Sequence, residues 1–138
     1  MLRRNWLKIK LVLSTLIALF YATAYAQFIN ISVQQAKKMI DAKDYGLILD
    51  VRTKEEFVGD LGHIEGAVLI PVQELNGRVA EIEKYKDKKV LVVCHSGVRS
   101  RKASDFLTQK GFGNIYNVVD GMLGWNSQKY PVRTKEKD

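Results

Sequence analysis

The chain has 138 residues, with 22 Lys and Arg against 15 Asp and Glu, and a formal charge of +7. Four of the cations and none of the anions lie in the first 26 residues, which leaves only +3 for the rest. A charge this small, without aromatic residues interleaved among the basic ones, argues against a nucleic-acid partner. The remainder is long enough for one domain with a real core.

The N-terminus has the three-part order of a secretory signal peptide. A basic stretch with no acidic residue precedes the apolar run Leu11–Tyr21, and Ala24-Tyr25-Ala26 supplies the small residues that a signal peptidase reads. We therefore expect residues 1–26 to be removed between Ala26 and Gln27, and the mature protein to be periplasmic or secreted, without stable membrane association. The apolar run is shorter than the ~20 residues of a spanning helix. An uncleaved N-terminal anchor is the alternative.

From residue 27 onward, short apolar runs alternate with amphipathic stretches, which is typical of βα units and a mainly parallel sheet. The predicted class is α/β, with one domain over residues 27–132 and a charged, frayed tail over 133–138. Strands are expected at Phe28–Ile31, Leu47–Val51, Val68–Ile70, Val90–Val93 and Ile115–Val119. Helices are expected over residues 33–42, 53–59, 73–85, 97–110 and 122–128.

The only cysteine, Cys94, follows the most β-prone run of the chain and precedes a predicted helix. Such a loop turns backbone N–H groups and the positive end of the helix dipole inward, which makes a nest for an anion. A thiol at its centre should have a lowered pKa. Gly97 lets the loop curl tightly, and Arg99 and Ser100 bring a cation and a hydroxyl to its rim. These features predict a sulfur nucleophile that meets anionic substrates.

Simpler interpretations compete with the functional ones. Cys94 could be a buried inert thiol, and Arg99 an ordinary solvated residue. Asp50 and Arg52 are more easily explained as structural than as catalytic residues, since a carboxylate near a buried strand end usually pairs with a cation or caps a turn. His63 is expected to fix a turn by hydrogen bonding, and Trp125 to pack under the sheet. With two histidines and one cysteine in the chain, a zinc site lacks ligands, so no metal is expected.

Four motifs, in order along the chain, resemble those of rhodanese domains. They are Leu49-Asp50-Val51-Arg52 with Glu55-Glu56-Phe57, Gly62-His63-Ile64-Glu65-Gly66-Ala67, Cys94-His95-Ser96-Gly97-Val98-Arg99-Ser100, and Gly121 with Trp125. The resemblance covers about residues 29–130. It implies a three-layer α/β/α fold around a central sheet of about five strands.

The resemblance also implies a reaction. Cys94 would take the outer sulfur of thiosulfate or a similar small anionic donor as a persulfide, and pass it to cyanide or a thiol acceptor, without a cofactor. Cys94 would be catalytic, and His95, Ser96, Gly97, Val98, Arg99 and Ser100 would bind substrate. The chain departs from the family pattern at Asp120, where a glycine is often found, and at His95, where thiosulfate-using members often have a cation. Asp120 would either change the rim of the site or cap the last helix.

Two alternatives to a sulfurtransferase that acts as a free enzyme remain. One is a sulfur carrier or rhodanese-like binding module that hands its persulfide to a thiol protein partner. The other is a phosphatase or arsenate reductase, which the loop disfavours, because only four residues separate Cys94 from Arg99 and cysteine phosphatases have one more. The absence of a second cysteine also disfavours an arsenate reductase that resolves through a disulfide.

Overall fold

The computed structural model describes residues 5, 6, 8–12 and 27–134. Residues 5, 6 and 8–12 are helical, whereas most of the predicted signal peptide, including its cleavage site, lies outside the described residues. Among the residues described, no helix has both the length and the apolarity needed to cross a membrane.

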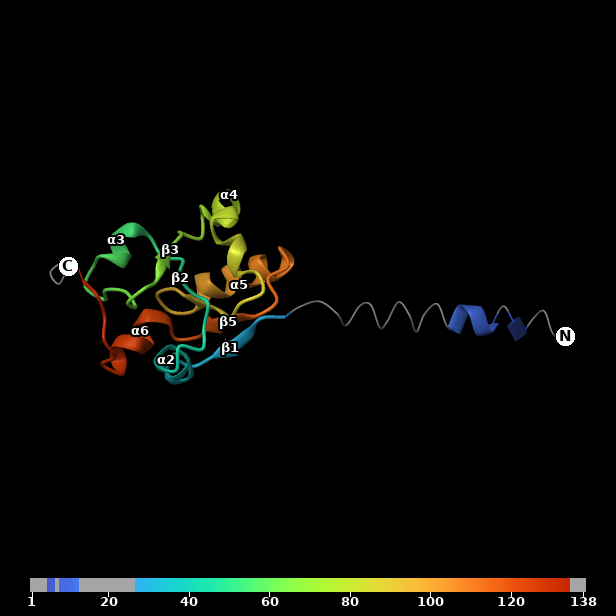
Figure 1. Ribbon diagram of the computed structural model, residues 1–138, viewed down its shortest axis with the longest axis horizontal. Coiled ribbons are helices and arrows are strands. Elements are labelled where there is room, and N and C mark those ends of the chain that lie inside the picture. The colour runs from blue at the N-terminus through green and yellow to red at the C-terminus, as the bar shows by residue number, and fades with distance from the viewer. Residues whose placement is uncertain (1–4, 7, 13–26, 135–138) are drawn as a thin grey trace.

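Five parallel strands form one sheet in the order β1-β5-β4-β2-β3 (Figure 1). They are β1 (Ile29–Ile31), β2 (Leu47–Asp50), β3 (Val68–Leu69), β4 (Val90–Val93) and β5 (Ile115–Val118). Strand β4 is central, and all four of its residues are buried, as a parallel strand covered on both faces requires.

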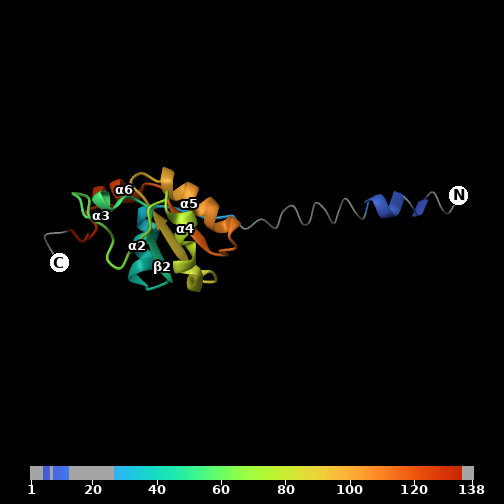
Figure 2. The same cartoon turned by 90° about the horizontal axis from the view of Figure 1, so that it is seen from above.

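Helices cover both faces of the sheet, which makes the predicted three-layer arrangement (Figure 2). They are α2 (Val33–Asp41), α3 (Lys54–Phe57), α4 (Leu75–Arg78), the 3-10 helix η1 (Val79–Tyr85), α5 (Val98–Gln109) and α6 (Gly121–Ser127). Alternate residues of β4 point to opposite sides. Val90 and Val92 pack with α4, η1 and α5, and Leu91 and Val93 pack with α2 and α6.

The helix predicted over residues 73–85 is divided into α4 and η1. Gly77 lies inside α4, and glycine is a poor helix former. At the N-terminus of α4, Glu74 makes no side-chain capping bond. Arg78 bonds the carboxylates of both Glu74 and Glu81, so ion pairs hold the junction although the helical geometry changes there.

Arg133, the first residue of the predicted tail, is paired with the domain. Arg133 forms an antiparallel bridge with His63, each backbone N–H donating to the other residue's carbonyl at 2.9 Å. Its side chain also bonds Glu65. The His63 ring stacks on Phe57 with ring centroids 3.7 Å apart, and its Nδ1 lies 2.9 Å from the Phe57 carbonyl oxygen. The predicted turn-fixing role of His63 is confirmed.

Candidate active site

Cys94 lies at the carboxyl end of the central strand, the edge where parallel α/β folds place their sites. Its side chain is buried, at 1% exposure. The next three residues form the loop into α5, and Gly97 occupies the N-cap position with φ of 94°. A Cβ at Gly97 would overlap the Val119 carbonyl oxygen. The loop therefore requires glycine here both for its backbone conformation and for its contact with the chain after β5.

The Cys94 sulfur sits among neutral hydrogen-bond donors. The Gly97 N–H donates to Sγ at 3.1 Å, and the Cys94 thiol lies 3.4 Å from Ser100 Oγ, to which it donates when protonated. Burial raises the pKa of Cys94, but hydrogen bonds from the Ser100 hydroxyl and from the backbone of Ser100, Ser96 and Gly97 outweigh it. The net pKa lies below the usual thiol range, as the sequence predicts. The loop is thus suited to a nucleophilic thiolate.

Helix α6 supports this loop from behind. The backbone N–H groups of Met122 and Leu123 donate to the carbonyls of Cys94 and His95 at 2.8 and 3.0 Å. This approach requires Gly121, which has φ of 52° and at which a Cβ would overlap both carbonyl oxygens. Trp125 is buried, and its Nε1 donates to the Pro131 carbonyl at 2.9 Å. The glycine–tryptophan signature therefore anchors the helix that braces the cysteine loop.

Arg99 does not present a free cation. Its Nη1 and Nη2 donate to the two carboxylate oxygens of Glu56 at 2.7 and 2.6 Å. The pair is partly buried, with both side chains about 30% exposed. The Arg99 guanidinium lowers the pKa of Glu56 to about 2, and Glu56 raises the pKa of Arg99. The pair stays ionised at neutral pH, with its charges cancelled. Substrate binding by Arg99 stays a prediction.

Asp50 and Arg52 form a buried ion pair, which agrees with the structural role expected of them. Both are completely buried, and Arg52 Nη2 and Nε donate to the Asp50 carboxylate at 2.7 to 3.1 Å. The same guanidinium donates to the carbonyls of Gly62 and Glu56 at 2.7 and 3.2 Å. All three guanidinium nitrogens of Arg52 therefore have an acceptor. The ion pair with Asp50 fixes the segment that carries Glu56.

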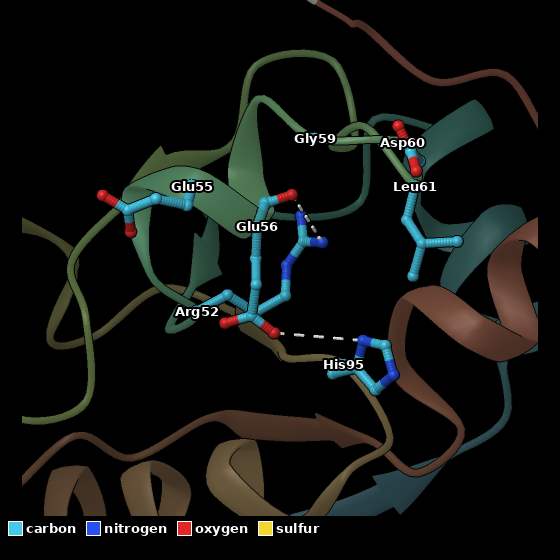
Figure 3. A pocket seen from close by; sticks show the side chains of 7 residues that line it. All are labelled: Arg52, Glu55, Glu56, Gly59, Asp60, Leu61 and His95. Atoms are coloured by element: carbon cyan, nitrogen blue, oxygen red, sulfur yellow. Dashed lines mark hydrogen bonds and ion pairs between the residues drawn. The ribbon is translucent and has the colours of Figure 1, made fainter.

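A hollow of about 330 Å³ lies beside the cysteine loop, between α3 and His95 (Figure 3). Its lining residues are Arg52, Glu55, Glu56, Gly59, Asp60, Leu61 and His95. In Figure 3 the Glu56 side chain reaches toward His95, whereas Glu55 extends away from it. The distance from His95 Nδ1 to Glu56 Oε1 is 3.9 Å. Three carboxylates thus share this rim of the site.

A second hollow, of about 420 Å³, borders the loop on its other side and includes Ser96, Asp120, Leu123 and Gly124. Asp120 stands at the N-terminus of α6, but its side chain makes no capping bond. Of the two roles proposed for Asp120 from sequence, the position on the rim agrees with the structure. Val98 and Leu123, which flank the loop, are exposed at 63% and 47%.

The structure brings the predicted loop residues together, and it adds one residue that the sequence did not single out. His95 is partly exposed, Ser96 and Val98 are exposed, and Gly97 and Ser100 are buried. Glu56 belongs to a motif noted in the sequence, yet nothing in the spacing predicts its pairing with a residue 43 positions away. In the part of the chain that the structure describes, no cluster of His, Cys, Asp and Glu could hold a metal ion.

Known proteins resemble this chain in sequence and in fold. Residues 32–128 match the model of the rhodanese-like domain. Thiosulfate sulfurtransferase 18 of Arabidopsis thaliana is 30% identical over 129 residues, covering 85% of this chain and 92% of the relative. YrkF of Bacillus subtilis, whose name proposes a sulfur carrier protein, is 36% identical to this chain. The alignment covers 72% of this chain and 51% of YrkF.

A solved rhodanese-like domain protein from Staphylococcus aureus superposes with a TM-score of 0.63 at 28% identity. That alignment covers 78% of this chain and 99% of the other. The match of residues 32–128 to the family model and the likeness of the fold agree, and the chain belongs to the rhodanese-like domain family.

Proposed function

We propose that the protein is a sulfurtransferase that carries a sulfane sulfur as a persulfide on Cys94. The observation that carries the proposal is the environment of the Cys94 sulfur, which is buried yet faces the N–H of Gly97 and the hydroxyl of Ser100. Burial alone would favour the neutral thiol, and these donors favour the anion. A thiolate stabilised in this way is the form that attacks sulfur.

The proposed reaction has two steps. The Cys94 thiolate attacks the outer sulfur of thiosulfate or a similar donor, a new S–S bond forms, and the donor's S–S bond breaks with its electron pair leaving on sulfite. An acceptor, cyanide or a thiolate, then attacks the outer persulfide sulfur. The Cys94–sulfur bond breaks, thiocyanate or an acceptor persulfide forms, and the Cys94 thiolate returns. One covalent intermediate between two half-reactions gives ping-pong kinetics.

The experiment is a steady-state assay of thiocyanate formation from thiosulfate and cyanide, with intact-mass measurement after exposure to thiosulfate alone. We expect turnover and the gain of one sulfur atom in the wild type, and neither in Cys94→Ser. Glu83→Gln is the matched surface control, since the Glu83 carboxylate is exposed on η1 and accepts a hydrogen bond from Lys86. A wild type that neither turns over nor gains sulfur from any sulfane donor contradicts the proposal.

A sulfur carrier that serves a protein partner is the second candidate. The exposed side chains of Val98 and Leu123 favour it, because they flank the loop that holds Cys94 and exposed apolar groups are common at protein contacts. The name of the relative YrkF also supports it. In that case the persulfide forms on Cys94, but its transfer to cyanide or small thiols is slow compared with its formation.

We also propose that the protein is exported and matures at Gln27. The support is the basic stretch, apolar run and Ala-Tyr-Ala sequence at the N-terminus, in the order typical of signal peptides. Export places the reaction in a compartment where disulfides form readily. A single cysteine avoids internal disulfide formation there.

A further inference from the structure

We propose that Glu56 is a specificity-determining residue that makes Cys94 prefer neutral or cationic sulfane-sulfur donors over dianionic ones, by holding Arg99 and cancelling its charge. This inference rests on the proposed sulfur transfer and names its donor class. It follows from the contacts of Glu56, from the charges around the loop, and from the way the Cys94 thiolate is stabilised.

Glu56 is held firmly in place. Its carboxylate receives both terminal nitrogens of Arg99, and its Oε2 also accepts from the Thr53 N–H at 3.0 Å. The Glu56 N–H donates to Thr53 Oγ1 at 3.3 Å, which completes a capping box at the start of α3. Because α3 fixes one partner and the first turn of α5 fixes the other, the ion pair is part of the site's frame rather than a chance surface contact.

The other charges on this rim do not replace the cation that Glu56 cancels. The guanidinium of Arg52, which lines the hollow, is already paired with buried Asp50. Glu55 and Asp60 add carboxylates to the same lining. A dianion that approaches Cys94 past α3 therefore meets carboxylates and paired guanidinium groups. Its approach is unfavourable compared with that of a neutral molecule.

The groups that contribute most to activating the nucleophile are neutral. Neutral donors, the Ser100 hydroxyl and the backbone of Ser96, Gly97 and Ser100, lower the pKa of Cys94 against the effect of burial. Removing Glu56 should therefore change which substrates reach the sulfur more than it changes the reactivity of the sulfur. This separates a role in specificity from one in catalysis.

The first test is the charge preference of alkylation, which requires no sulfur transfer. Iodoacetate and iodoacetamide react with the same thiolate and differ by one negative charge, so the ratio of their rates reports the potential at Cys94. Glu56→Gln leaves Arg99 uncompensated, and we expect the iodoacetate-to-iodoacetamide ratio to rise about threefold. Arg99→Gln should lower it by a similar factor, and the double variant should return it to the wild-type value. The differences should shrink in high salt.

The second test is donor kinetics in the same four proteins. For Glu56→Gln we expect the KM for thiosulfate to fall about tenfold, since the donor carries two charges, with kcat changed less. The KM for a neutral organic persulfide should stay within about twofold. Glu83→Gln serves as the control for a lost surface carboxylate, and thermal unfolding checks that each variant is folded.

The outcomes separate the inference from the proposed function. The inference requires the highest iodoacetate-to-iodoacetamide ratio in Glu56→Gln, an intermediate ratio in the wild type and the double variant, and the lowest ratio in Arg99→Gln. Any other order would overturn the role of Glu56, whatever the transfer activity. Ratios in that order, without sulfur transfer to or from Cys94 in any of the four proteins, would support the charge at the site and contradict the sulfurtransferase proposal. If Arg99→Gln is poorly folded, Glu56→Gln alone still decides the inference by the direction of its ratio.

Discussion

Two opposing effects meet at the sulfur of Cys94. Its burial disfavours the thiolate, and hydrogen bonds from Ser100, Ser96 and Gly97 favour it, with the balance lowering the pKa. In the described part of the chain, the hydrogen bonds of the sulfur involve Gly97 and Ser100, and neither group is charged. The activation is local and dipolar, and it depends on a few atoms held at hydrogen-bond distance.

Replacing Ser100 with Ala should remove one of the hydrogen bonds that favour the thiolate, so that the opposing effect of burial weighs more. Loss of the hydroxyl raises the pKa of Cys94, so the thiolate fraction at neutral pH falls, and the pH profile of iodoacetamide alkylation should shift to higher pH. The matched control is Ser104→Ala. Ser104 is equally buried, one turn along α5, and its Oγ has no hydrogen-bond partner in the described part of the chain. A profile unchanged in Ser100→Ala, or shifted equally in both variants, would contradict this account.

For single residues, the sequence predicts features that depend on neighbours in the chain, but it does not predict the pairing of Glu56 with the distant Arg99. The strand-to-helix loop around Cys94 and the structural role of Asp50 depend on neighbours in the chain, and both were predictable from the sequence pattern. The Glu56–Arg99 pair was not, because it depends on how α3 is placed beside α5. Arg99 was accordingly interpreted either as a cation on the rim of the loop or as an ordinary solvated residue, whereas its charge is cancelled by Glu56.

Among the secondary-structure elements, α6 contributes most to the site without supplying a reactive group. Its first N–H groups, which have no partner within the helix, bond the carbonyls of Cys94 and His95. The cysteine loop thereby gains a fixed floor, and α6 gains acceptors for its N-terminus. Both sets of contacts depend on Gly121, because a larger residue there would overlap the two carbonyl oxygens.

We expect Gly121→Ala to destabilise the protein by about 2 to 4 kcal/mol, because a Cβ overlaps two carbonyl oxygens and the backbone φ is positive. The thiol should also lose reactivity as the loop moves. Urea unfolding and iodoacetamide alkylation measure the two effects. Gly77→Ala is the control, since a Cβ there meets nothing within 4 Å, and it should be neutral or stabilise by about 0.5 to 1 kcal/mol. Equal stability of the two variants would refute the prediction.

The elements themselves were largely predictable from hydrophobic pattern. The strands begin and end within one residue of their predicted bounds, and Ser32 caps α2 as expected. The division of α4 from η1 was missed because the apolar face of residues 73–85 continues across Gly77. The hydrophobic pattern of a sequence predicts which face of a helix is buried, but it does not predict whether the backbone is α-helical or 3-10.

Over the whole domain, two hydrophobic clusters lie on opposite faces of the sheet, and Cys94 belongs to the one formed with α4, η1 and α5. The three-layer architecture was predictable from the alternation of apolar runs and from the family resemblance. The pairing of Arg133 with His63 was not, because it joins residues 70 positions apart through a single antiparallel bridge. No periodic pattern marks such a contact.

The export proposal also belongs to the whole molecule. We expect the protein recovered from its native compartment to begin at Gln27, which intact-mass measurement or N-terminal sequencing would show. Replacing Ala24 and Ala26 with Leu should block cleavage, because signal peptidase requires small residues there, and leave the longer chain with the membranes. Gln27→Asn, just after the predicted site, is the control and should still be processed. Recovery of the wild-type chain with its N-terminus intact would contradict cleavage.

The dependence of the cysteine loop on α6 has a consequence in time. A ribosome completes residues 121–125 after Cys94, so a growing chain carries the thiol before it carries the helix that holds the loop. Until α6 docks, the cysteine has the reactivity of any cysteine in an unfolded peptide. The lowered pKa of the thiol is therefore acquired late, only in a chain whose last helix is in place.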